Sequence, residues 1–247
     1  MPAATRFTLY DLVVDLIPGV VAILLSFAIV GQQRLRDIVQ VYGAALPAVA
    51  LLAIGYVVGR ILHSLSNYDA VERTGIAVYN VIPLLDSLEE KDRRFSARLA
   101  HVLSEGDDET LEYAVAERAQ ESIFDRFDVT TPSPDGSNDE PSTDSEGIGA
   151  IPERRYARYL SDTITYRKQG LSWKYGILAT FFRNMWVVLV GASCFYFLTR
   201  WGAIDRRVVA ISAVFLVSGL ICLQQRFKFK RRQIRTMLNE IALADTQ

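Results

Sequence analysis

The sequence predicts an all-α membrane protein with four transmembrane helices in two hairpins and a helical cytosolic domain inserted between spans 2 and 3. Four stretches of the chain carry no charged side chain: Leu16–Gln33, Ile38–Gly59, Asn184–Thr199 and Val208–Gln225. A hydrocarbon core is crossed by roughly 20 apolar helical residues, with a range of about 17–25. The stretches form two close pairs separated by a long charged segment, a distribution that a buried soluble core does not explain.

Two details of the spans bear on how they pack. The third stretch becomes long enough only by taking in the apolar residues that precede Arg183. Pro18-Gly19, near the start of the first span, is expected to kink the helix, and neighbouring helices would then have to satisfy the freed backbone groups. In the second span Gly55 and Gly59 form a small-xxx-small pair, which permits a close helix approach.

These patterns divide the chain into four parts. Residues 1–62 are expected to form the first hairpin, 63–182 the cytosolic domain, 183–225 the second hairpin and 226–247 a basic amphipathic cytosolic helix. Residues 129–152 carry five acidic side chains, no basic one and few apolar ones, which predicts a disordered linker. The C-terminal helix is expected to face lipid or to pack beneath the bundle.

Three helical segments show apolar stripes at helical spacing, and these stripes predict core or subunit contacts rather than a cofactor site. Their members are Phe95, Leu99, Val102 and Leu103; Leu111, Val115, Ala119, Ile123 and Phe127; and Ile234, Met237, Leu238 and Ile241.

Basic residues near the spans predict the orientation. With the N-terminus inside, thirteen basic residues flank the inner ends of the spans and five lie in the two short outer loops. Because cytoplasmic flanks are enriched in Lys and Arg, both termini and the inserted domain are expected to be cytosolic. The predicted location is therefore the cytoplasmic membrane, crossed several times.

Motifs that carry catalysis are missing from the sequence. It contains no Gly-rich phosphate loop, HExxH, CxxC or GxSxG. Its two histidines, His63 and His101, have no obvious metal partner. Ionisable residues inside a membrane indicate functional sites by default, and only Asp15 and Arg183 come near, both at span boundaries. The expectation is a protein that is not an enzyme and that has no metal and no cofactor.

The charge of the inserted domain is uneven. From Ser64 to Phe182 there are 22 acidic and 13 basic residues, which opposes binding to double-stranded nucleic acid. Glu153–Lys174 instead carries a net charge of +4 with interleaved aromatic rings, a combination that can hold a nucleotide or a short single strand. The candidate ligand-binding residues are Arg154, Arg155, Tyr156, Arg158, Tyr159, Arg167 and Lys168. The alternative is that these residues contact anionic membrane lipid.

Two segments resemble a known family. FTLYDLVVDLIPG (residues 7–19) is similar to the opening of a family of prokaryotic four-span proteins, and so is WKYGILATFFRNMW (residues 173–186), which enters the third span. The overall plan resembles the membrane effectors of phage-defence systems such as Hailong. The resemblance covers both membrane pairs and leaves the middle of the inserted domain unmatched. It implies an oligomeric channel opened by an oligonucleotide or cyclic nucleotide signal, and it transfers no ligand-binding residue.

A ligand-gated ion channel is therefore the leading functional hypothesis. Four spans do not easily enclose a hydrated pore alone, so a homo-oligomer is required, and a tetramer is expected. Rings of arginine favour anions, and the candidate pore-mouth residues are Arg34, Arg36, Arg200, Arg206 and Arg207 outside and Arg183 inside. The main alternative is a non-conducting membrane scaffold that recruits a cytosolic partner. A membrane enzyme ranks third, because the spans show no paired carboxylates and no metal ligands.

Overall fold

The computed structural model describes residues 10–31, 40, 44–81, 99, 102–103, 111–127 and 170–243. Across these ranges the regular secondary structure is entirely helical, which confirms the all-α prediction. The elements are the π-helix η1 (Asp11–Leu16), α1 (Ile17–Val30), α3 (Ala45–Ser66), α4 (Asp69–Val81), α6 (Leu111–Phe127), α8 (Leu171–Thr199), the short 3₁₀ helix η4 (Trp201–Ala203) and α9 (Arg206–Ala242). The candidate ligand-binding residues and the acidic linker lie outside the described ranges.

The prediction of four helices that are long and apolar enough to span a membrane is confirmed. Within the described ranges, the helices Asp11–Val30, Ala45–Ser66, Leu171–Thr199 and Arg206–Ala242 are long and apolar enough to cross a bilayer. Two of them are much longer than their charge-free stretches, because α8 passes through Arg183 without a break and α9 continues past Gln225 for several more turns. The C-terminal basic segment is therefore the end of a spanning helix rather than a separate helix.

The chain divides into two compact units. The membrane unit comprises Met1–Ser87 and Ile177–Phe229, and the helical module comprises Leu88–Gly176 and Lys230–Gln247. Since α8 and α9 run from one unit into the other, each of these helices contributes to both.

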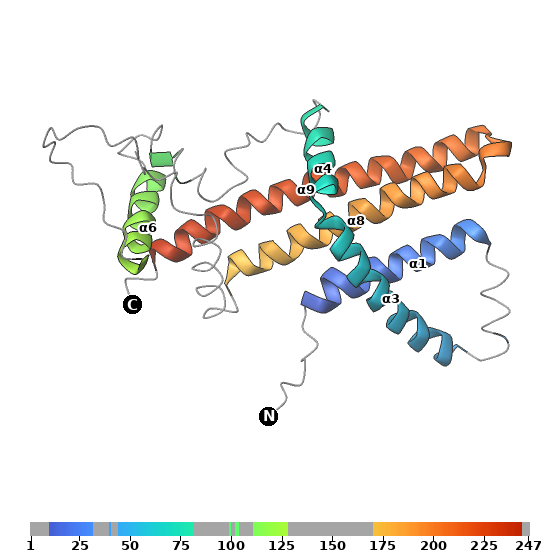
Figure 1. The fold of residues 1–247 in the computed structure, drawn as a ribbon, viewed down its shortest axis with the longest axis horizontal. Coiled ribbons are helices and arrows are strands. Elements are labelled where there is room, and N and C mark those ends of the chain that lie inside the picture. The colour runs from blue at the N-terminus through green and yellow to red at the C-terminus, as the bar shows by residue number, and fades with distance from the viewer. Residues whose placement is uncertain are drawn as a thin grey trace, which may run out of the picture. The chain divides into compact units, whose positions relative to one another are not determined.

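Within the membrane unit, α1 crosses α3, while α8 and α9 lie side by side and antiparallel, joined at η4 (Figure 1). The end of α1, the start of α3 and the α8–α9 connection all lie toward the right-hand end of that view. The α8–α9 pair is joined by a hydrogen bond of 2.9 Å from the Ser193 hydroxyl to the Ser212 carbonyl oxygen and by stacking of Phe182 on Phe229.

The small residues of the first pair determine how closely its helices approach. A Cβ atom added at Gly19 would overlap the carbonyl oxygen of Gly55 and lie 2.6 Å from the Gly59 nitrogen, and one added at Gly59 would overlap the Asp15 carbonyl oxygen. Backbone therefore meets backbone at this crossing, which only glycine allows. The close approach predicted for Gly55 and Gly59 is confirmed, and Gly19 is the residue that they meet.

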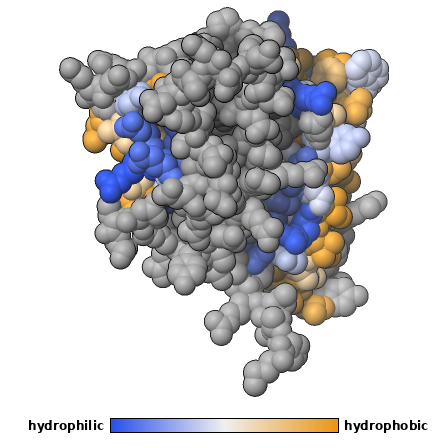
Figure 2. Space-filling model, turned by 60° about the vertical axis from the view of Figure 1, so that its left-hand side comes forward, coloured by the Kyte–Doolittle hydropathy of each residue, from blue (hydrophilic) through white to orange (hydrophobic). Residues whose placement is uncertain are grey.

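The outer faces of the membrane unit are apolar. On α3 the side chains of Leu46, Val49, Ile54 and Val57 are more than half exposed, and α9 presents a similar row around Val214. Figure 2 shows hydrophobic residues at the surface of the described part, along the right-hand side of the view. Large exposed apolar surfaces mark contact with a membrane or with another protein, as expected for helices that span a bilayer.

The core of the helical module confirms the apolar face predicted for the C-terminal helix. The buried cluster comprises Leu99, Val102, Ala116, Ala119, Ile123, Met237, Leu238, Ile241 and Ala242. The end of α9 therefore packs its apolar face on α6 and not against lipid. The stripe predicted on α6 is partly wrong: Leu111 is 82% exposed, because the end of α9 covers the face that runs through Ala116, Ala119 and Ile123.

Candidate functional site: a polar junction between the spans

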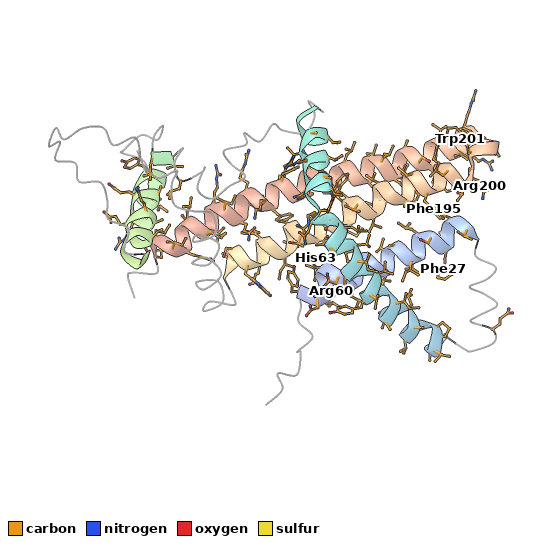
Figure 3. All side chains as sticks on the ribbon, viewed as in Figure 1. Phe27, Arg60, His63, Phe195, Arg200 and Trp201 are labelled. Carbon is orange, nitrogen blue, oxygen red and sulfur yellow. The ribbon has the colours of Figure 1, made fainter. Side chains whose placement is uncertain are left out.

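A cluster of polar groups joins three of the spanning helices where α1 begins and α3 ends. We call it the polar junction and define it as Val14, Asp15, Arg60, His63, Ser66 and Asn184. All six residues belong to the membrane unit. Figure 3 shows the side chains of Arg60 and His63 beside the beginning of α1, at the opposite end of the membrane unit from Arg200 and Trp201.

The junction originates in Pro18. Proline has no N–H group, and its ring clashes with the carbonyl four residues earlier, which here belongs to Val14. The helix before Pro18 is a π-helix, in which the Ile17 N–H bonds to the carbonyl oxygen of Leu12, five residues back. The missing donor is replaced from another helix: the Asn184 amide nitrogen on α8 donates to the Val14 carbonyl oxygen at 2.8 Å. The expectation that a neighbouring helix satisfies the backbone freed at Pro18 is confirmed.

Asn184 also binds the second span. Its amide oxygen accepts a hydrogen bond of 2.6 Å from the Ser66 hydroxyl at the end of α3. Both Asn184 and Ser66 are completely buried. One side chain of α8 thus contacts η1 and α3 together. Buried polar groups without a partner are costly. Moving these helices apart would therefore cost free energy, because it would leave the Asn184 amide without its partners.

An ion pair lies next to Asn184 in the junction. The Asp15 side chain is completely buried, and its Oδ2 accepts a hydrogen bond of 3.0 Å from Nη1 of Arg60, whose own side chain is 54% exposed. Its other oxygen, Oδ1, lies 3.9 Å from Nδ1 of His63. Neither Oδ1 of Asp15 nor Nδ1 of His63 has a hydrogen-bond partner. The Asp15 carboxylate is therefore balanced by Arg60 on one side only.

Tyr10 closes the junction at the start of the first span. Its ring meets that of His63 edge to face, with the centroids 6.3 Å apart. Burial raises the pKa of the Tyr10 hydroxyl, and the Asp15 carboxylate raises it further, while Arg183 and Arg60 act in the opposite direction. The phenol consequently stays neutral, and the charges that act on it are those of Asp15, Arg183, Arg60 and Asp11.

The polar groups of the junction are suited to holding helices together. Among the described residues, no group of three or more His, Cys, Asp or Glu side chains lies close enough to hold a metal ion. The groups present can hold helices together by hydrogen bonds and one ion pair. The Asp15 carboxylate can also gain a second partner, because its Oδ1 faces Nδ1 of His63 without a hydrogen bond.

The sequence identified part of this site. The sequence marks Asp15 and Arg183 as ionisable residues at span boundaries. The structure places Asp15 in the junction and Arg183 on α8, directly before Asn184. Three other candidate mouth residues, Arg200, Arg206 and Arg207, are exposed at the α8–α9 connection. The remaining two, Arg34 and Arg36, lie outside the described ranges.

Two important members of the junction were missed, Arg60 and Asn184. In the sequence, Arg60 is one of the thirteen basic residues at the inner ends of the spans. The signal for it was its position, since it directly follows one charge-free stretch and Asp15 directly precedes another. Asn184 carries no charge and was counted as part of the third span. The signal for it was the unpaired carbonyl that Pro18 creates, which requires a donor from a neighbouring helix.

Comparison of the chain with protein-family models, curated proteins and solved structures finds no match.

Proposed function

We propose that this chain is an oligomeric membrane effector: a ligand-gated ion channel opened by a cytosolic nucleotide or oligonucleotide signal in antiviral defence. The observation that carries the proposal is the length of α9. Its 37 residues extend about 55 Å, whereas a hydrocarbon core is about 30 Å thick. One uninterrupted helix therefore contributes its first part to the membrane unit and its last turns to the core of the helical module.

A continuous helix is a means of transmitting force, because its backbone hydrogen bonds link each turn to the next. Movement of the helical module shifts the end of α9, and with it the spanning part of the same helix. The first turn of α8 is tied to the same end of α9, since the Ser172 hydroxyl hydrogen-bonds to the Glu240 carboxylate. Both helices of the second pair are thus moved together by a change in the module.

This function requires a membrane topology with two hairpins. Both termini and the helical module would lie in the cytosol, and the hairpins would cross the cytoplasmic membrane. This topology is supported by the positions of the end of α1, the start of α3 and the α8–α9 connection, which lie toward the same end of the membrane unit (Figure 1). It is supported also by the basic residues of α9 beyond the apolar stretch, which the positive-inside rule places in the cytosol.

A channel is favoured over a scaffold by the packing of the module. A scaffold that recruits a partner needs an open apolar face on that module, but in the part of the module that the structure describes, the predicted stripes of α6 and α9 pack largely against each other. Oligomer formation, with a tetramer expected, is left to the exposed apolar faces of the spanning helices. The resemblance to phage-defence effectors supplies the class of signal.

The test is reconstitution of the purified protein into liposomes that contain a chloride-sensitive dye. A panel of cyclic and linear di-, tri- and tetranucleotides is added outside to vesicles whose protein exposes its cytosolic side. At least one is expected to produce chloride flux, and the protein is expected to run as an oligomer. Absence of flux with every nucleotide would refute the channel, and an intact oligomer without flux would favour the scaffold.

Ion selectivity gives a sharper version of this test. Arg206→Gln combined with Arg207→Gln removes two exposed charges at the α8–α9 connection, and the permeability of chloride relative to potassium is expected to fall. Lys228→Gln is the matched control, because it removes an exposed charge near the other end of the spanning part of α9. Equal effects of both changes would remove the assignment of these arginines to the pore mouth.

A further inference from the structure

We propose that Asn184 is a releasable clasp, and that its release from Val14 and Ser66 is the step by which movement of α8 reaches the first pair of spans and opens the pore. This inference rests on the proposed channel function. The channel proposal does not say which contact stabilises the closed state, and the clasp names that contact. Val14, Ser66 and Asn184 all lie within the membrane unit.

Asn184 is placed to link α8 to the first pair as a whole. Its amide nitrogen bonds to Val14 at 2.8 Å and its amide oxygen to Ser66 at 2.6 Å. Both contacts use the same planar amide group, so a rotation or shift of α8 that breaks one disturbs the other. Ser172, tied to Glu240 in the helical module, precedes Asn184 on the same helix by about 18 Å.

The Val14 carbonyl is an acceptor whose partner can change. In an ordinary α-helix it would be paired internally, and no other residue would depend on it. Here Pro18 offers it no N–H, and the π-helix η1 turns this part of the backbone toward α8. Short π-helical segments within helices recur at functional sites. The Val14 carbonyl of the first span is therefore paired with a side chain of α8.

A second arrangement of the junction would form a hydrogen bond that the present arrangement lacks. Asp15 Oδ1 and His63 Nδ1 lie 3.9 Å apart, buried and without hydrogen-bond partners. Closing this gap by a small shift of α3 against η1 would satisfy both atoms. It would also move Ser66, three residues beyond His63 on the same helix, relative to Asn184. Loss of the Asn184 bonds is thus offset by a bond between Asp15 and His63, as two nearly balanced states require.

The test uses chloride flux without any added signal. Asn184→Ala removes the clasp, and Pro18→Ala leaves Asn184 in place but gives residue 18 an N–H that competes for the Val14 carbonyl. Asn184→Ala loses two bonds per subunit and is expected to raise basal flux about tenfold, since each hydrogen bond between helices in a membrane is worth a modest factor. Pro18→Ala weakens only the bond to Val14 and is expected to raise basal flux by a smaller factor. Because both act through the same oxygen, the combined variant is expected to leak no more than Asn184→Ala alone.

Ser193→Ala is the matched control. It removes a buried hydrogen bond of 2.9 Å from the same helix, but one that joins α8 to α9 and not to the first pair. Its basal flux is expected to equal that of the unchanged protein. An equal rise in this control, or a fall in flux for Asn184→Ala, would overturn the clasp while leaving the channel function intact.

Thermal unfolding in detergent, followed by tryptophan fluorescence, supplies a measure that does not depend on conduction. The effects of Pro18→Ala and Asn184→Ala on the melting temperature are expected to be strongly non-additive. Additive effects would show that the two residues do not share a contact and would refute the clasp. If instead the effects are coupled but the unchanged protein conducts with no nucleotide of the panel, the channel function fails, and the role of Asn184 in gating fails with it.

Discussion

Replacing Arg60 by alanine is expected to destabilise the membrane unit much more than replacing Asp15 by asparagine. The Asp15 carboxylate is completely buried, and Arg60 is its charged partner at 3.0 Å. Arg60→Ala leaves that carboxylate buried and without a countercharge, whereas Asp15→Asn leaves a neutral amide whose oxygen still accepts the hydrogen bond from Arg60. The two changes break the same ion pair, but only one strands a charge.

The structure sets the expected magnitudes. Removing one member of a buried ion pair costs about 3–5 kcal/mol. The lower value applies here, because the Arg60 side chain is 54% exposed and water or lipid headgroups can take part of its place. For Asp15→Asn the loss is the difference between a charged and a neutral hydrogen bond, about 1 kcal/mol. At about 2–4 °C per kcal/mol for a chain of this size, the melting temperature should fall by about 6–12 °C and about 2–4 °C respectively.

The assay is thermal unfolding of the purified protein in one detergent, with the double variant included. Arg60→Ala combined with Asp15→Asn should be more stable than Arg60→Ala alone, because the stranded charge is then removed. Arg207→Ala, an exposed arginine at the start of α9, is the control and should change stability by no more than about 0.5 kcal/mol. If Asp15→Asn proves as damaging as Arg60→Ala, or if the double variant shows the sum of the two losses, the carboxylate is not held by Arg60 and the reasoning is wrong.

Two further predictions concern packing. Gly19→Val should prevent assembly of the first pair, because a Cβ there overlaps the Gly55 carbonyl, whereas Gly191→Ala should be tolerated, because its Cβ would meet nothing within 4 Å; the fraction of monodisperse protein on size exclusion measures both. Ile241→Ala should cost about 2–5 kcal/mol in the module core and increase proteolysis of α6 on limited digestion. Leu111→Ala at an 82% exposed site should leave the digestion pattern unchanged, and equal sensitivity of the two would contradict the assigned core.

The apolar patterns predicted the large elements well, because hydrophobic periodicity and charge-free length are local properties of the chain. The four spans follow from stretches without charge, and the face of Ile234, Met237, Leu238 and Ile241 follows from helical spacing. The same patterns divide α9 into two parts. A basic segment after an apolar one indicates a new helix, although nothing at residue 225 interrupts α9.

The sequence by itself determined that this chain is helical, that it contains four helices able to span a membrane, and that Pro18 leaves a carbonyl of the first span in need of a donor. Only the tertiary structure decided which side chain supplies it. Asn184 lies 170 residues from Val14 in the chain, and an uncharged amide inside an apolar helix gives no local signal of its partner. The same holds for Asp15 and Arg60: each marks the end of a span, but only the close crossing of glycine on glycine brings the carboxylate against the guanidinium. Such contacts depend on how the helices pack, and packing is a property of the whole membrane unit.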